Sequence, residues 1–485
     1  MLHVPLANLL HRQRGRLNNL AVLLVANVFT AGVGFVTTVT IANTLGAARF
    51  GELAYALAIG GILAVNVRFG MDRSLIRDLA HYPERFNETL AASLLARGLL
   101  LVLSLGGLAV LAALPIAGLE LSWGMLLVIA ATALNPLQIA NVFDIWEVQG
   151  RHALYGCLER GLYFALVWAV VLAAPERLGL AWIGLALLAA TLLYLFVQYR
   201  YAWNRLKPTL RAIPARRLAR TAAGLVADNT WLWLASVGVL GMYALNKVIL
   251  KHFAGFADLG VYAASFQLIS VALLVLKNMA RIGRPILARH TSPRAASPAA
   301  AARFLGLYLA AGIVAVGLIA LPAIAVPQWI LRALFTAEYA AGYWVLRLMG
   351  VYLLFRVFDT VLGQYVIMLR MDSVFFGASV AAGLTGLAAS LILIPPLAAV
   401  GAALALLAGE IIFALIYLLM TLVHITRLSA AQRQDDNHED MHNQRGHRDQ
   451  DECSRAFACR GVSNDTCLRN CSTLGPVSSP PGSRL

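Results

Sequence analysis

Several apolar stretches of this chain, each long enough to cross a membrane, contain ionisable side chains near their middle. Arg356 and Asp359 are three residues apart in one of them, so a helix places both on one face. Other ionisable residues in such stretches are Asp228, Lys247, Arg347 and Glu410. A charge at the centre of a membrane helix costs about 2.5–3.5 kcal/mol unless it faces a partner or water. The pattern therefore predicts a polar cavity within the membrane.

We expect this cavity to hold an anionic group and to relay an ion. The cationic candidates for substrate binding are Lys247, Arg347 and Arg356, and the carboxylate candidates for ion coupling are Asp228, Asp359 and Glu410. Trp231, close to Asp228 in the sequence, is a candidate for stacking on a sugar ring, and Asn27 is a polar candidate in the first stretch. The alternative is that Arg356 and Asp359 only neutralise each other as an intrahelical ion pair.

No motif of a soluble enzyme accompanies these residues. The chain has no Walker phosphate-binding loop, no nucleophile elbow, no HExxH metal motif and no large extramembrane domain. Four cysteines near the end of the chain have spacings that match no common zinc framework: Cys453, Cys459, Cys467 and Cys471. We therefore predict no enzymatic activity, no cofactor and no bound metal.

The elements that must position the charged residues are about twelve membrane helices. The chain is 60% hydrophobic and 13% charged, and a span needs roughly 20 apolar residues. Backbone groups in lipid must be satisfied within their own segment, so these stretches must be helices. The predicted spans cover residues 17–43, 50–69, 89–113, 122–146, 153–174, 180–199, 222–249, 258–280, 303–325, 341–368, 373–395 and 399–424. Pro136 predicts a kink in the fourth span.

The net charge of +15 follows the positive-inside rule and does not indicate a nucleic-acid partner. Arg and Lys concentrate in alternate loops, around residues 12–16, 73–85, 200–220 and 281–294, and the loops between these carry few positive charges. Basic loops stay on the cytoplasmic side of a membrane. The pattern therefore predicts that both termini are cytoplasmic.

The longest basic loop divides the spans into two halves of six. Both halves open with a comparable passage, IANTLGAARFGELAY at 41–55 and, in the second half, VILKHFA at 248–254 followed by LGVYAA at 259–264. We predict a cytoplasmic N-terminus (1–16), a six-helix bundle (17–199), a basic cytoplasmic linker (200–221), a second six-helix bundle (222–424) and a polar, disordered cytoplasmic tail (425–485). Paired repeats facing a central site are typical of alternating-access transporters.

The passage at 41–55, together with AGVGF at 31–35 and the pair Asn18-Asn19, resembles the polysaccharide flippase family of the multidrug/oligosaccharidyl-lipid/polysaccharide (MOP) exporter superfamily. The resemblance covers about residues 15–425, and LGVYA at 259–263 matches the second half of that family. It implies an all-α polytopic protein with two six-helix bundles around a central cavity. The implied activity is translocation of undecaprenyl-diphosphate-linked oligosaccharide repeat units, as for O-antigen or exopolysaccharide, across the bacterial cytoplasmic membrane.

The resemblance also implies partners: the lipid-linked glycan, membrane lipid, a coupling ion (H⁺ or Na⁺), and polysaccharide polymerase or export machinery. Lipid II flippases usually have a basic–acidic pair after GFV in the first span, where this chain has Thr37-Thr38. An ion-coupled drug-type exporter of the same superfamily is the main alternative, although its substrates are mostly cationic. A membrane glycan polymerase is disfavoured because the outer loops are short.

Overall fold

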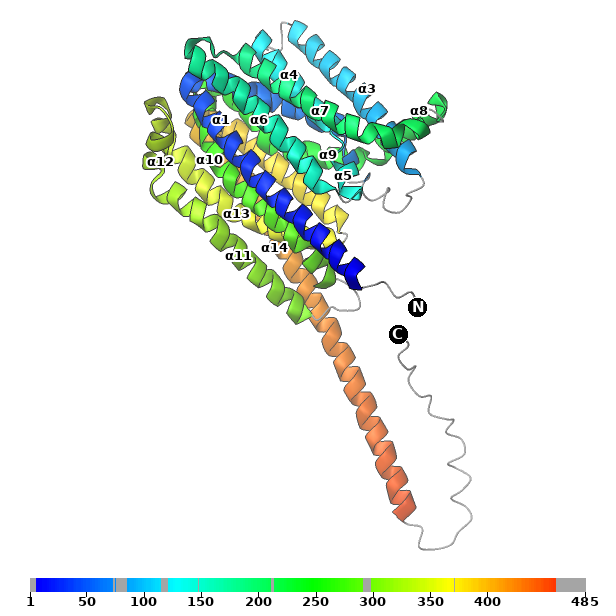
Figure 1. The fold of residues 1–485 in the computed structure, drawn as a ribbon. Helices are drawn as coiled ribbons and strands as arrows, with labels where there is room; N and C mark the ends of the chain where they lie inside the picture. Colours follow the sequence, from blue (N-terminus) through cyan, green and yellow to red (C-terminus); the bar gives the residue numbers. More distant parts are fainter. Residues whose placement is uncertain are drawn as a thin grey trace. The chain divides into compact units, whose positions relative to one another are not determined.

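The computed structural model describes residues 6–72, 75, 85–114, 121–146, 148–210, 213–290, 298–369 and 371–458. Every regular element within these ranges is helical, which confirms the all-α prediction (Figure 1). The chain divides into two compact units, residues 1–422 and residues 423–485. The helices that concern function lie in the first unit.

The helices run along the whole described chain with short connections. The α-helices are α1 (Leu6–Arg68), α3 (Phe86–Ala113), α4 (Trp123–Leu134), α5 (Ala140–Ile145), α6 (Gln149–Ala173), α7 (Leu180–Leu210), α8 (Ala215–Asp228), α9 (Thr230–Leu240), α10 (Asn246–His290), α11 (Pro298–Ala325), α12 (Pro327–Leu334), α13 (Tyr343–Met368) and α14 (Asp372–Ala458). Short 3₁₀ turns are η3 (Asn135–Leu137), η4 (Pro175–Arg177) and η6 (Ala337–Gly342), and η5 (Gly241–Leu245) is a π-helical turn.

Eight helices in the described part of the chain are long and apolar enough to span a membrane. Three of them, α1, the segment from α9 to α10, and α14, are bent and supply two arms each. The 26-residue helix α13 is also of spanning length, although it carries several charges. We interpret the separate arms together with α13 as the twelve predicted spans.

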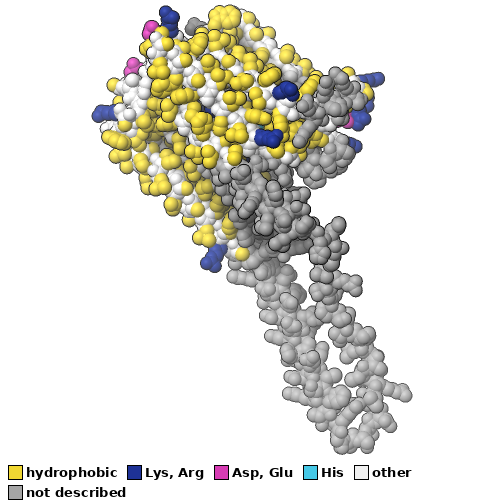
Figure 2. Space-filling model, in the orientation of Figure 1, with side chains coloured by type: hydrophobic (Ala, Val, Ile, Leu, Met, Phe, Trp, Pro, Cys, Tyr) yellow, Lys and Arg dark blue, Asp and Glu magenta, His cyan; other side chains and the backbone are white. Residues whose placement is uncertain are grey.

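Apolar side chains cover the outside of the first unit. Leu99, Val110 and Leu318 are each more than half exposed, and hydrophobic atoms occupy most of the face seen in Figure 2. Contact of such a large apolar surface with water is unfavourable, whereas lipid tails solvate it. The protein is therefore a multi-pass membrane protein.

Two glycines bend the helices that open each half. Gly46 in α1 has φ +75° and Gly255 in α10 has φ +84°, a left-handed backbone that glycine adopts without steric cost. In both helices a second glycine follows five residues later, at Gly51 and Gly260. The two passages compared in the sequence therefore share one backbone geometry.

The arms that follow these bends cross at very close range, and α1 lies beside α10 in Figure 1. A Cβ atom on Gly51 would overlap the carbonyl of Phe256, and one on Gly260 would overlap the carbonyl of Ala47. Only glycine permits this approach of two backbones. The crossing joins the first half of the chain to the second.

The predicted kink in the fourth span is confirmed. Helix α4 ends at Leu134, the turn η3 contains Pro136, and helix α5 begins at Ala140. Proline has no N–H group to donate and its ring blocks the preceding turn. The break leaves the carbonyl of Pro136 available to another partner.

The basic stretch at 200–221 is mostly helical. Helix α7 extends to Leu210 and α8 begins at Ala215, immediately after Pro214. Asn229 separates α8 from α9, and the apolar segment begins at Thr230 rather than at residue 222. Asp228 is therefore the last residue of α8, two residues before the apolar segment that begins at Thr230.

In the second unit, α14 continues as a helix to Ala458, through part of the segment for which composition predicts disorder. Residues 425–458 contain no proline and only one glycine, Gly446, so nothing in their backbone interrupts a helix. Residues 459–485, with Cys459, Cys467 and Cys471, lie outside the described residues.

Candidate functional site

Arg356 stands between two carboxylates from different helices. Its Nη1 atom lies 2.6 Å from Oδ2 of Asp359, three residues later on α13, and 3.2 Å from both carboxylate oxygens of Glu410 on α14. Glu410 has no exposed surface, whereas the side chains of Arg356 and Asp359 are 28% and 15% exposed. With both carboxylates ionised, these three residues, the Arg356 cluster, carry one excess negative charge.

Two tyrosines extend the cluster. The Tyr243 hydroxyl donates to Oε2 of Glu410 at 3.4 Å and lies 3.1 Å from the hydroxyl of Tyr352. Tyr352 precedes Arg356 by one turn on α13, and Tyr243 belongs to the π-helical turn η5. Single π-helical turns are frequent at functional sites. The arrangement can bind a proton or a small cation at carboxylates that are wholly or largely buried in protein.

Asn246 holds the bend of α14 next to this cluster. Its Nδ2 atom donates to Oγ of Ser390 at 3.2 Å and to the carbonyl of Ala402 at 3.0 Å. These two acceptors lie on opposite sides of the bend at Ala398, which has φ +48° after two prolines. Asn246 is fully buried, so it acts as a brace between α10 and both arms of α14.

Lys247 follows Asn246 on α10 and has no acidic partner in the described part of the chain. Its Nζ atom lies 5.0 Å from the centre of the Phe266 ring. A cation–π contact contributes about 0.5–2 kcal/mol. It does not neutralise the charge of a buried lysine as a carboxylate partner would. The positive charge of Lys247 is therefore available to an anion.

Arg347 and Asp228 lie apart from the Arg356 cluster. Arg347 donates through Nε to the carbonyl of Ile324 at 2.9 Å, and its guanidinium lies 4.8 Å from the centre of the Trp344 ring. Asp228 is the exposed last residue of α8. The structure does not bring either one to the other predicted charges.

Trp231 and Asn27 also lie elsewhere. Trp231 is 71% exposed and meets Phe376 edge to face, with ring centres 5.9 Å apart. Asn27 is half-buried on α1, where its main-chain carbonyl accepts from the Thr30 hydroxyl at 3.1 Å. Their roles in binding remain predictions.

A second buried charged group lies in the first half and was missed in the sequence. Arg97 on α3 is 3% exposed, donates to the Pro136 carbonyl at 2.6 Å, and lies 2.7 Å from Oδ1 of Asp72. Oδ2 of Asp72 lies 3.1 Å from Nε of Arg68. Since Arg97 is a charge within the predicted third span, the rule that identified Arg356 applies to it equally.

The passage at 41–55 contacts the segment between α12 and α13. Asn43 donates to the Leu334 carbonyl at 2.8 Å and accepts from the Thr336 N–H at 3.1 Å. The N–H of Ala47 donates to Glu338 at 2.9 Å, and the Tyr339 hydroxyl donates to the Ala42 carbonyl at 2.9 Å. These four bonds, the α1 latch, tie the bend at Gly46 to the second half.

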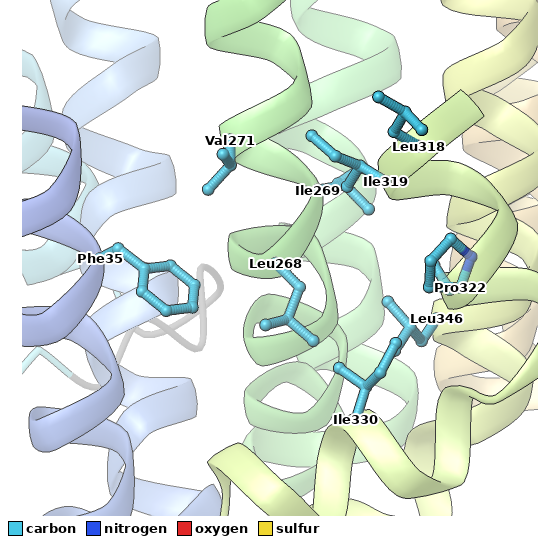
Figure 3. A pocket seen from close by; sticks show the side chains of 10 residues that line it. Phe35, Leu268, Ile269, Val271, Leu318, Ile319, Pro322, Ile330 and Leu346 are labelled. Atoms are coloured by element: carbon cyan, nitrogen blue, oxygen red, sulfur yellow. The ribbon is translucent and has the colours of Figure 1, made fainter. Parts of the chain in front are cut away.

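An apolar groove of about 270 Å³ lies between α1 and helices α10 to α13. Figure 3 shows Phe35 of α1 on one side and Leu268, Val271, Pro322 and Leu346 on the other. No charged residue lines it, so its chemistry suits a hydrocarbon chain. Within the described residues, no group of three or more His, Cys, Asp or Glu is placed to hold a metal ion.

Comparison with known proteins identifies the family. A family described as polysaccharide biosynthesis protein matches residues 17–289, which is more than half of the chain. No curated protein matches by sequence. A structure of lipid II flippase MurJ in an inward closed conformation superimposes with a TM-score of 0.63 at 12% identity, covering 84% of this chain and 92% of that one.

Two structures with the description multidrug resistance MATE family transporter of the MOP superfamily, one inward-facing and one outward-facing, are also similar. The inward-facing one has a TM-score of 0.60 at 12% identity, covering 86% of this chain and 99% of its own. The outward-facing one has a TM-score of 0.53 at 13% identity, covering 84% and 96%. The chain thus has the MOP transporter fold, and it belongs to the polysaccharide biosynthesis protein family.

Proposed function

We propose that the protein flips undecaprenyl-diphosphate-linked oligosaccharide repeat units from the inner to the outer leaflet of the bacterial cytoplasmic membrane, for synthesis of a surface polysaccharide. The diphosphate and sugars cannot cross hydrocarbon unaided, because their polar groups would lose their hydrogen bonds. Alternating access between the two halves would carry the headgroup across, while the polyprenyl chain stays in lipid.

The observation that carries the proposal is the Arg356 cluster, a buried charged group in the middle of a membrane helix of a polysaccharide-biosynthesis family member. Ionisable residues at such depth mark transport pathways. We assign Asp359 and Glu410 to ion coupling because the cluster has one carboxylate more than it has cations. Arg356 then holds the two carboxylates in place and is released to the substrate when one of them binds an ion.

Lys247 supports an anionic substrate, since the described residues offer it no carboxylate. The groove beside Phe35 supports a lipid-linked one, since its lining is apolar. Asp228 lies outside the Arg356 cluster, so we assign it no contact with the ion. Contact with the substrate remains our proposal for Arg347, Asn27 and Trp231.

Loss of the protein in its host tests this proposal. If the protein is a flippase, its loss should cause lipid-linked repeat units to accumulate in the inner leaflet and should abolish surface polysaccharide. Drug sensitivity should not change. A drug-type exporter, favoured by the similarity to the MATE fold, predicts the reverse: raised drug sensitivity with normal surface glycan. If the protein were a polymerase, its loss would leave single, unpolymerised repeat units in the outer leaflet.

A further inference from the structure

Helix α8, the amphipathic helix before the apolar segment of the second half, packs on protein along one face. Ala222 and Leu225 form this packed face, and each is 7% exposed. They belong to an apolar cluster that includes Ala92 and Ala96 of α3, and α8 runs beside α3 in Figure 1. The packed face therefore fixes how α8 is turned about its own axis.

The other side of α8 is uncovered. Four exposed residues, the open face, lie within a sector of about 60° at about 100° per residue: Arg216, Arg220, Ala223 and Ala227. This sector is roughly opposite the packed face. The open face is basic over the first half of the helix, and over the second half it is small and apolar.

The positive charge of the open face is not neutralised by neighbouring protein. Arg217 is bound to Glu88 on α3, with its Nε and Nη2 atoms 2.8 and 2.7 Å from the two carboxylate oxygens. Arg216 and Arg220 have no hydrogen bond or close ion pair with a described residue. Asp228, at the far end of α8, is about 12 Å along the helix from Arg220. Two positive charges are therefore left on the open face.

The ion pair with Glu88 also indicates the depth of these charges. Both arginines of the open face lie within one turn of Arg217, so they are level with Glu88 near the start of α3. Leu95 and Leu99 are 45% and 60% exposed and lie about 10 and 16 Å further along α3. Acyl chains cover such leucines, and the headgroup region extends about 5–8 Å beyond the hydrocarbon. The two free arginines are therefore at the depth of lipid headgroups.

We propose that the open face of α8 binds the headgroups of anionic phospholipids through Arg216 and Arg220. A guanidinium group forms paired hydrogen bonds with phosphate oxygens. The charge pattern predicts that this part of the chain is cytoplasmic, and the negative surface of the cytoplasmic leaflet attracts basic segments next to a span. Ala223 and Ala227 leave room for the upper part of the acyl chains. The proposal goes beyond the transported cargo and does not depend on it.

Lipid bound to α8 acts on the start of the second half. Asn229 alone separates α8 from α9. Trp233 of α9 stacks on Phe69, the residue after α1, with ring centres 5.0 Å apart, and donates through Nε1 to Asn66 at 3.0 Å. A headgroup that holds α8 therefore holds the junction where α9 meets the end of α1.

Quenching by spin-labelled lipids in nanodiscs tests the proposal. The full chain, with its five cysteines replaced by serine, carries a fluorophore at Ala223→Cys. We expect spin-labelled phosphatidylglycerol to be preferred to spin-labelled phosphatidylcholine by about tenfold at this position. Arg216→Gln/Arg220→Gln should reduce the preference to about twofold or less. Equal quenching by the two lipids without the arginine changes would overturn the proposal.

Two controls separate the site from the overall charge of the protein. Arg177→Gln/Arg332→Gln removes the same charge from exposed residues elsewhere and should keep the preference. A fluorophore at Val314→Cys on α11, where the side chain is 67% exposed, should show no preference. A loss of preference in the first control would attribute the effect to net charge and contradict a site on α8.

Salt provides an independent readout. Because the screening length falls from about 10 Å at 0.1 M to about 3 Å at 1 M, 1 M salt should remove most of the preference at Ala223→Cys. The Arg216→Gln/Arg220→Gln variant should unfold at the same temperature as its parent, since both side chains are exposed. A preference that persists in this folded variant would contradict binding by the two arginines and leave the proposed flippase function standing.

Discussion

At the scale of single residues, Arg356 compensates the negative charge of the Glu410 carboxylate. Glu410 has no exposed surface and both of its oxygens accept from Arg356. Removing one partner of a buried ion pair typically costs about 3–5 kcal/mol, because the other charge is left uncompensated. Asp359 shares the same guanidinium, so the three residues respond together to any change.

Glu410→Gln is expected to preserve the fold and to abolish ion-dependent transport. The amide keeps the shape of Glu410 and still accepts from Arg356, whereas Asp359 alone then balances the arginine. Thermal unfolding of the purified protein should stay within a few degrees of the wild type, while transport loses its response to an imposed ion gradient. A retained response would remove Glu410 from ion coupling.

Arg356→Met is expected to destabilise the protein by about 3–5 kcal/mol, since two carboxylates then face each other. The double variant Arg356→Met/Glu410→Gln should recover part of this loss, because Glu410 no longer carries an uncompensated charge whereas Asp359 still does. Unfolding in denaturant measures all three proteins. Additive losses in the double variant would show that the residues act independently.

The sequence was sufficient to pair Arg356 with Asp359, because a spacing of three residues fixes neighbours on a helix. It could not bring Glu410 to them, since that contact depends on how α14 packs. Tyr243 was missed because a π-helical turn shifts the register of a helix and has no sequence signature. Asp228 ends the amphipathic helix α8, which continues into the predicted start of the seventh span, and such a helix boundary has no clear signal in an apolar sequence.

At the scale of elements, the bends at Gly46 and Gly255 and the crossing at Gly51 and Gly260 determine how α1 meets α10. The sequence predicted that both halves open with comparable passages. It did not reveal their shared geometry, because positive φ and close approach are properties of the folded backbone. The α1 latch adds side-chain and main-chain bonds on the same segment.

Gly260→Ala is expected to destabilise the protein by at least 2 kcal/mol, because the added methyl group overlaps the Ala47 carbonyl. Gly306→Ala is the matched control: it lies on α11 with open space around it, and alanine favours a helix over glycine by about 1 kcal/mol. Thermal unfolding compares the two. Equal stability of both variants would contradict the close crossing.

Asn43→Ala combined with Glu338→Gln is expected to loosen the α1 latch. Three of its four hydrogen bonds involve these two side chains, and each contributes about 0.5–1.5 kcal/mol. Spin labels placed on α1 and on the segment between α12 and α13 should show a larger fraction of molecules with a long distance between the two labels. A distance distribution identical to the wild type would show that the latch does not hold the halves together.

At the scale of the whole molecule, composition and charge pattern are enough to predict an all-α membrane protein, since lipid leaves few alternatives for the backbone. The family follows from the match to residues 17–289, and the fold from structures only 12–13% identical. The substrate is not fixed at this scale, because transporters of one fold carry different cargo. It must be tested on the protein itself.

Flipping in proteoliposomes tests the central claim most directly. Vesicles would contain a short undecaprenyl-diphosphate-linked glycan, and an impermeant reagent would score the sugars on the outer surface. We expect wild-type protein to equilibrate the glycan faster than empty vesicles do, and Arg356→Ala and Asp359→Ala to abolish this gain. Equal rates with and without folded wild-type protein would contradict a flippase and favour small-molecule export.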